Sequence, residues 1–308
     1  MIEARHLVKR YGSTVAVNDL SFFIRPGLVT GFLGPNGAGK TTTMRMILGL
    51  DAPTQGSVTV GGRSYRDLPA PMREVGALLD AKALHGGRRA RDHLRCLAQS
   101  NGIPRRRVDE VLRIVGLEDV ARRRAKSLSL GMSQRLGIAS ALLGDPAVLI
   151  FDEPVNGLDP DGIHWVRTLI RALAAEGRTV LVSSHLMSEM ALTADHLLVI
   201  GKGALIADTS VDDFVRSSSR QSVHVRSPQA AELAARCRQA GATVRDGSTG
   251  TGPGVIEITG MDSPEVGKLA AADGIALSEL IPLRASLEEA FMELTRQSVE
   301  YQAAGVTR

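Results

Sequence analysis

Residues 34 to 41, Gly-Pro-Asn-Gly-Ala-Gly-Lys-Thr, have the types and the spacing of a loop that binds nucleotide phosphates. Glycines allow the tight bend that directs backbone N–H groups into one concavity, and a following helix adds positive charge at its N-terminus. Lys40 can reach the β- and γ-phosphates, and the Thr41 hydroxyl can hold Mg²⁺. The expected contact residues are Gly34, Asn36, Gly37, Ala38, Gly39, Lys40, Thr41 and Thr42.

Two adjacent carboxylates, Asp152 and Glu153, follow an apolar run at 147–151 that is typical of a buried strand. Ligands of parallel sheets bind at the carboxyl ends of the strands. Asp152 could therefore support Mg²⁺ directly or through water, and Glu153 could act as the general base on an attacking water. Two acids at a strand end are usually only solvated, but beside a phosphate-binding loop the functional interpretation is much the stronger.

Two further segments could contact phosphate. His185 follows the apolar run 179–182, so it is expected at the same sheet edge, where it could donate a hydrogen bond to a γ-phosphate. Ser129 and Gly131 precede an apolar helix and would form a second anion site at its start. A second anion site is useful if it serves the nucleotide of a neighbouring molecule.

The elements that must position these residues can be read from periodicity. Residues 1–27 alternate apolar and polar positions, which predicts an antiparallel, partly exposed sheet. The apolar runs 147–151, 179–182 and 197–200 alternate with helical segments, which predicts a parallel sheet covered on both faces. The stretch from about 85 to 140 has helical spacing and loops.

A Ser-rich stretch at 217–221 is expected to be a linker. Beyond it the order β-α-β-β-α-β predicts a small α+β domain, with a flexible loop at 247–254. Ser286 and Glu289 have the spacing of a capping box and predict a final helix. This region contains no catalytic constellation, so we expect a non-catalytic role.

Composition excludes several classes of protein. Hydrophobic residues make up 44% of the 308 residues, enough for a substantial core, yet no segment reaches the ~20 apolar residues that span a bilayer. Cys96 and Cys237 are far apart, which predicts two reduced thiols rather than a metal or redox site.

The net charge of +4 is unevenly spread. Residues 85–126 hold twelve Lys/Arg against five Asp/Glu, with arginine clusters at 88–89, 105–107 and 122–124. A solvated helical face is the simplest interpretation, and contact with a membrane surface or a membrane partner is the sharper one. Nucleic acid is disfavoured because no aromatic residue interleaves with these arginines.

Taken together, these motifs resemble the nucleotide-binding subunit of an ATP-binding cassette (ABC) transporter over roughly residues 2–215. The resemblance implies the ABC-type P-loop NTPase fold of the α/β class, with a parallel core sheet, an antiparallel β subdomain and a helical subdomain at about 85–140. We therefore expect an ATPase domain at 1–216 and a small C-terminal α+β accessory domain at 221–308.

The resemblance also implies partners and further contacts. Two such domains, a homodimer or another pair, would dimerise head to tail, so that Ser129 and Gly131 contact the γ-phosphate held by the other copy. Tyr11 would stack on adenine, and Val17 would pack on the edge of that ring. Asp80 stands where the family usually has Gln; it could face Mg²⁺ or the lytic water but cannot donate a hydrogen bond as an amide does.

The implied activity is hydrolysis of ATP with Mg²⁺, which powers a separate transmembrane permease subunit at the cytoplasmic face of the membrane. The signature Leu-Ser-Leu-Gly-Met at 128–132 resembles that of bacterial drug and peptide-antibiotic exporters of the bacitracin and daunorubicin type. Two alternatives are a soluble ABC ATPase acting on ribosomes or DNA, and a P-loop phosphotransferase. The chain lacks the second cassette or long coiled coil of the former, and the 128–132 segment argues against the latter.

Overall fold

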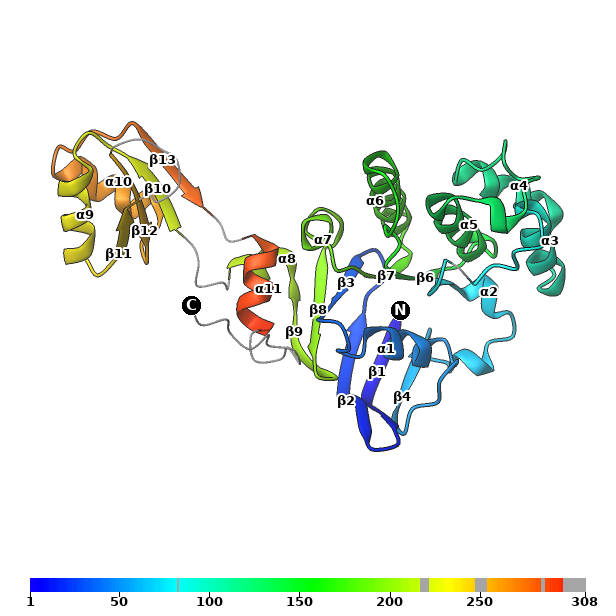
Figure 1. Cartoon of the computed structure of the whole chain (residues 1–308). Coiled ribbons are helices and arrows are strands. Elements are labelled where there is room, and N and C mark those ends of the chain that lie inside the picture. Colours follow the sequence, from blue (N-terminus) through cyan, green and yellow to red (C-terminus); the bar gives the residue numbers. More distant parts are fainter. Residues whose placement is uncertain (82, 217–221, 247–253, 284–285, 296–308) are drawn as a thin grey trace, which may run out of the picture. The chain divides into compact units, whose positions relative to one another are not determined.

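The computed structural model (Figure 1) describes the whole chain except residues 82, 217–221, 247–253, 284–285 and 296–308. Contacts divide it into two compact units, one formed by residues 1–211 with Thr295 and the other by residues 212–294. The division falls a few residues before the expected linker, which itself lies outside the described residues, as does nearly all of the expected loop at 247–254. Among the described helices, none is long and apolar enough to cross a membrane.

A six-stranded sheet forms the centre of the first unit. All neighbouring strands pair in parallel except the last two, which are antiparallel. Its middle strands are buried on both faces, as the unbroken apolar runs predict. The strands in spatial order are β5 (Val75–Leu78), β6 (Val148–Asp152), β7 (Thr179–Ser183), β3 (Val29–Leu33), β8 (His196–Gly201) and β9 (Ala204–Ser210).

A three-stranded antiparallel sheet lies beside helix α1 (Lys40–Ile47), and the apolar side chains of both form one core cluster with residues of the main sheet. This sheet confirms the alternation seen in residues 1–27. Its strands in spatial order are β2 (Thr14–Ile24), β1 (Ile2–Tyr11) and β4 (Gln55–Val60).

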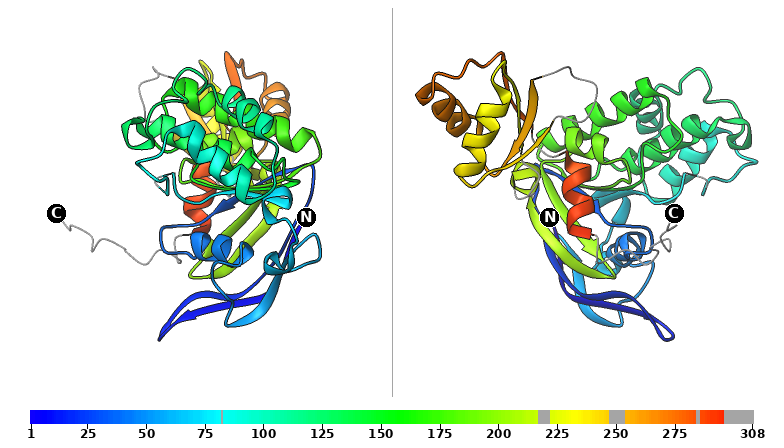
Figure 2. Two further views of the ribbon diagram at one scale, coloured as in Figure 1. Left: turned by 90° about the vertical axis from the view of Figure 1, so that its right-hand side faces the viewer. Right: turned by 60° about the vertical axis from the view of Figure 1, so that its left-hand side comes forward.

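Helices cover the rest of the first unit. Figures 1 and 2 show α3, α4 and α5 gathered together at one side of the sheet. Helix α5 packs against the edge strand β5. The helices and helical turns are 65–67, α2 (Pro71–Glu74), α3 (Ala90–Ser100), α4 (Arg105–Ile114), 125–127, α5 (Leu130–Leu142), α6 (Pro160–Ala175) and α7 (Met187–Thr193).

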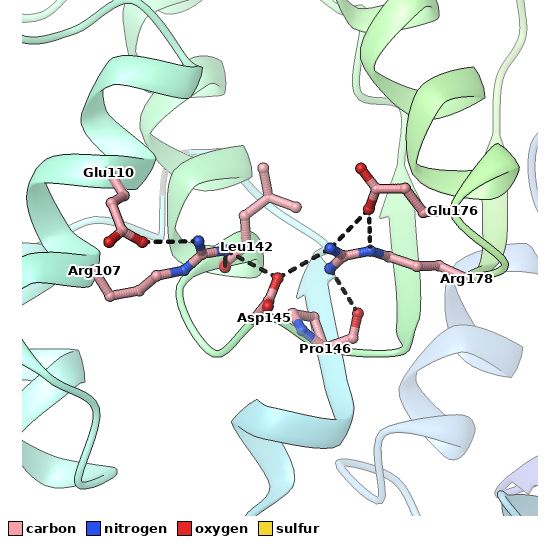
Figure 3. Close-up of polar contacts among 7 residues, drawn as sticks. All are labelled: Arg107, Glu110, Leu142, Asp145, Pro146, Glu176 and Arg178. Carbon is pink, nitrogen blue, oxygen red and sulfur yellow. Dashed lines mark hydrogen bonds and ion pairs between the residues drawn. The ribbon is translucent and has the colours of Figure 1, made fainter.

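Asp145 ties the helical group to the central sheet (Figure 3). It follows α5 with a left-handed backbone, φ 55°. Arg107 of α4 donates through Nη2 to Asp145 Oδ1 at 3.1 Å and to the Leu142 carbonyl at 3.0 Å. Arg178, just before β7, donates to the same Oδ1 at 3.0 Å. One carboxylate oxygen therefore links α4, the end of α5 and the start of β7.

In the second unit, four antiparallel strands and two helices follow the predicted order β-α-β-β-α-β, with helix α8 (Val211–Arg216) before them and one further helix after them. Its core combines strand and helix side chains such as Val225, Leu233 and Ile258. Reciprocal hydrogen bonds between Ser286 and Glu289 confirm the capping box. The elements are β10 (Ser222–Arg226), α9 (Ala230–Gln239), β11 (Thr243–Asp246), β12 (Val255–Thr259), α10 (Ser263–Ala272), β13 (Glu279–Leu283) and α11 (Leu287–Thr295).

Candidate functional site

The loop after β3 wraps the start of α1. Gly39 is the N-cap of α1 with φ 101°, and a Cβ there would lie 2.5 Å from the Ala16 carbonyl oxygen, so both conformation and space require glycine. Lys40 Nζ donates to the carbonyls of Gly34 at 2.6 Å and Pro35 at 3.1 Å. Burial lowers the pKa of Lys40, against the opposing influence of Glu153 and Asp152. The ammonium is therefore desolvated beside two carboxylates, where an added polyanion would strongly favour its charged form.

Neighbouring strands bring the predicted residues together. Because β6, β7 and β3 are adjacent and parallel, their carboxyl ends meet at one edge of the sheet. Thr41 Oγ1 donates to Asp152 Oδ2 at 2.7 Å. Together with the backbone groups of the loop they line a pocket of about 440 Å³. Its lining residues are Ala16, Asn36, Gly37, Ala38, Gly39, Lys40, Thr41, Thr42, Leu79, Asp152, Glu153 and Asn156.

The pair formed by Thr41 and Asp152 suits Mg²⁺. The ion prefers oxygen ligands and usually takes only one or two from the protein, with phosphate and water completing its shell. Here a hydroxyl and a carboxylate meet beside the phosphate-binding loop. Ser183, in register with Asp152, donates from its hydroxyl to Asp152 Oδ1 and so fixes the carboxylate.

Glu153 is held by its backbone and by its side chain. Its φ of 51° is left-handed, its N–H donates to Ser183 Oγ at 3.0 Å, and its carbonyl accepts from Gln134 Nε2 at 2.9 Å. Its Oε2 lies 2.7 Å from His185 Nδ1 and accepts from the His185 backbone N–H at 3.3 Å. A carboxylate is thus presented to the pocket with an imidazole directly beside it, which suits activation of a water near bound phosphate.

Ser129 and Gly131 lie at the start of α5 and are not among the residues that line this pocket. Ser129 is the N-cap, exposed, with Oγ accepting from the Met132 N–H at 3.2 Å. Next to it, Leu130 packs against Gly157, where φ is 74° and a Cβ would lie 2.2 Å from Leu130 Cδ2. The start of α5 therefore lies outside the pocket of its own chain.

The remaining predicted residues lie around the pocket. Tyr11 ends β1 half-exposed, its hydroxyl donating to Asp51 Oδ2 at 2.9 Å. Lys9 Nζ lies over the ring, 4.9 Å from its centroid, in the position of a cation–π contact. Asp80 is exposed after β5, and its neighbour Leu79, rather than Asp80, lines the pocket.

Val17 requires a correction. Its side chain is fully buried beneath the loop, in the core shared by α1 and the antiparallel sheet. Ala16, one position earlier, lines the pocket instead, because successive residues of a strand point to opposite faces. A residue with no exposed surface cannot pack on a ring edge, and at this position Ala16 is the residue that reaches the pocket.

Sequence reasoning also missed two residues that hold Asp152 and Glu153. Ser183 is the last residue of β7 and bonds to both. Gln134 is 4% exposed in the largely buried helix α5. A polar residue within an apolar helix that follows the second anion site could have pointed to Gln134, whereas Ser183 gave no signal beyond its place before His185.

Comparison with known proteins gives two family matches. A family model described as ABC transporter matches residues 17–156. A model described as a domain of unknown function, DUF8746, matches residues 221–288.

Similar proteins match between 69% and 97% of this chain. The uncharacterized ABC transporter ATP-binding protein YhcH of Bacillus subtilis is 37% identical over 97% of each chain. The bacitracin transport ATP-binding protein BcrA of Bacillus licheniformis is 40% identical over 71% of this chain and 73% of that protein. The lantibiotic transport ATP-binding protein SrtF of Streptococcus pyogenes is 37% identical over 69% and 92%.

Solved structures share the fold of about two thirds of this chain. An ATP-binding subunit of an ABC transporter superimposes with a TM-score of 0.65 at 29% identity, covering 70% of this chain and 92% of that one. A dimeric, post-hydrolysis cassette, MJ0796 bound to ADP and Pi, gives a TM-score of 0.63 at 24% identity over 68% and 99%, a likeness of fold alone.

Proposed function

The chain belongs to the ATP-binding proteins of ABC transporters and hydrolyses ATP, and from that premise we propose that two copies close head to tail around two ATP molecules to drive a separate membrane subunit. One observation carries the proposal. The pocket unites a phosphate-binding loop with Asp152 and Glu153, yet Ser129 and Gly131, a second anion site of the same chain, do not line it. A sister copy can supply that site, and closure would then exclude water from both nucleotides.

Each residue then has a defined task. The loop and Lys40 bind the phosphates, and the Tyr11 ring supports adenine. Thr41 and Asp152 would hold Mg²⁺, which neutralises phosphate charge when bound; Asp80 is the further candidate near it. Glu153 takes a proton from the attacking water, and His185 orients Glu153 and senses the γ-phosphate.

A substitution of Glu153 tests this assignment. Glu153→Gln keeps the size and the acceptor oxygen but removes the base, so ATP turnover should fall by about a hundredfold or more while ATP still binds. ATP-bound dimers should accumulate, visible by size-exclusion chromatography with light scattering. Undiminished turnover would remove Glu153 from its role.

Lys40→Ala serves as the contrasting variant. It removes the cation that contacts the phosphates, so ATP binding itself should be lost in a fluorescent-nucleotide titration and no trapped dimer should form. Unchanged affinity would contradict the phosphate-binding role of the loop.

The transported substrate is a finer proposal. Relatives named for bacitracin and lantibiotic transport support export of a drug or peptide antibiotic, with the chain held at the cytoplasmic face of the membrane through a permease subunit. We also propose that residues 221–308 form a non-catalytic accessory domain. Purification of the chain from its host membrane should recover the permease, and loss of that pair should raise sensitivity to the exported compound.

A further inference from the structure

Two basic segments that are distant in the sequence are paired side by side. Arg88 and Arg89 precede α3, and residues 122–126 follow α4. Arg89 and Arg124 are antiparallel bridge partners. The flanking hydrogen bonds run from the Ala90 N–H to the Arg123 carbonyl at 3.0 Å and from the Ala125 N–H to the Arg88 carbonyl at 2.8 Å. This is the pattern of a non-hydrogen-bonded pair, in which opposite side chains share a face and approach most closely.

The cations of these two segments are exposed, and the described residues provide them with no acidic partner. Four other arginines of the 85–126 region pair with acids of the same region: Arg91 with Asp109, Arg95 with Asp92, Arg107 with Glu110 and Arg113 with Glu118. Within the part of the chain that the structure describes, no ion pair joins an acid to any of six exposed cations, here called the basic patch. They are Arg88, Arg89, Arg122, Arg123, Arg124 and Lys126.

Fold stability does not explain the patch. Like charges directly opposite one another on paired strands are destabilising. Arg89 is also the N-cap of α3, makes no capping side-chain bond, and places a cation at the positive end of the helix dipole. His93, one turn further, feels the same field: burial, then Arg88 and His85, lower its pKa. The chain thus holds together charges that repel each other.

We propose that the basic patch binds the headgroups of anionic phospholipids. Clusters of four to eight Lys/Arg beside a membrane bind acidic lipid, and guanidinium groups match phosphate oxygens in pairs. Residues 86–89 and 122–126 offer only charge, glycine and alanine, without the amides, hydroxyls or aromatic rings that would recognise a peptide sequence or stack on bases. A diffuse anionic surface needs charge alone. The proposal relies on the proposed function only for placing the chain beside a membrane.

Vesicle co-sedimentation of the full chain, without nucleotide, tests this. The chain should bind vesicles of phosphatidylcholine with about 30% phosphatidylglycerol, bind little to pure phosphatidylcholine, and be released by salt. Arg88→Gln with Arg89→Gln should weaken binding about tenfold or more.

The matched control is Arg105→Gln with Arg106→Gln. It removes the same two charges from exposed residues that begin α4. Helix α3, whose eleven residues span about 16 Å, and the loop after it lie between them and Arg89 in the chain. It should bind vesicles nearly as the parent does. ATP binding and melting temperature, unchanged in both variants, establish that they are folded.

Three results would overturn the proposal. They are equal binding to neutral and anionic vesicles, equal losses in the two variants, and tighter binding of single-stranded RNA or an acidic peptide than of the anionic vesicles, lost in the Arg88/Arg89 variant. Since no nucleotide is present, none of these results depends on whether Glu153 is the base, and failure of the Glu153→Gln test leaves the vesicle result standing.

Discussion

Glu153 is positioned by residues that never touch a reacting atom. Its left-handed backbone is uncommon for a residue with a side chain, and two hydrogen bonds, with Ser183 and Gln134, hold it there. Such conformations persist only where surrounding structure fixes them, and they cluster at functional sites. The direction in which the Glu153 carboxylate points is therefore set from β7 and from α5.

Ser183 carries more of this support than any other side chain. Ser183→Ala would leave the Glu153 N–H without its acceptor and release Asp152 Oδ1, while Ser183→Thr keeps the hydroxyl. We expect about a tenfold fall in kcat for the alanine variant, since losing a buried hydrogen bond costs about 1–3 kcal/mol, and a higher Mg²⁺ requirement. Turnover measured across Mg²⁺ concentrations checks this. Equal kcat in all three proteins would show that Ser183 does not support the site.

Single residues of the site were predictable where chemistry imposes a pattern. Phosphate binding requires particular residue types at fixed spacing. The loop at 34–41, Asp152 and Glu153 can therefore be recognised in the sequence. Val17 was placed wrongly because adjacent residues of a strand point to opposite faces. An error of one residue therefore assigns the side chain to the wrong face. Ser183 escaped because its role depends on the register of β6 against β7, which no local pattern contains.

Among the elements, α4 and α5 are joined to the sheet by Asp145. Asp145→Ala removes both arginine bonds and places alanine at φ 55°, so we expect the free energy of unfolding to fall by about 2 kcal/mol, discounted because the carboxylate is largely exposed. Denaturant titration measures it.

Two companion variants separate the causes. Asp145→Asn keeps the acceptor oxygen and a residue that tolerates this backbone, so it should lose less than half as much. Asp145→Gly removes the bonds without strain. If the glycine variant has the same free energy of unfolding as the parent, Asp145 matters only for the turn, and the link between α4 and β7 does not stabilise the protein.

Elements were easier to predict than their neighbours in space. Periodicity identified the antiparallel sheet, the buried parallel strands and the β-α-β-β-α-β order. A strand buried on one face alternates apolar and polar residues, and a strand buried on both faces is a continuous apolar run. It could not give the spatial order of the six strands, nor bring residues 88–89 against 122–126. Both depend on packing between segments far apart in the chain.

At the scale of the whole molecule, the head-to-tail arrangement predicts that two defective chains repair each other. Ser129→Asp keeps a good N-cap but repels phosphate, and Lys40→Ala removes the cation with which the loop binds phosphate. A mixed pair contains one site with both defects and one with neither. An equal mixture should therefore regain about one quarter of parental turnover, whereas each variant alone is nearly inactive.

The mixture has a clear control and a clear contrary result. Ser129→Asn, an uncharged N-cap, should retain turnover far better than Ser129→Asp. If ATPase measured at several mixing ratios never exceeds the sum of the separate variants, each site is built from one chain and the pairing is wrong.

The close fit of Leu130 against Gly157 bears on timing. In a head-to-tail pair, the helix start next to Leu130 and the turn next to Gly157 would serve opposite nucleotides, although both belong to one chain. Gly157 has no side chain that could move aside, so a displacement of the turn is passed directly to Leu130 and to the start of α5. We expect cleavage at one site to shift the residues around the other, while each site still turns over on its own.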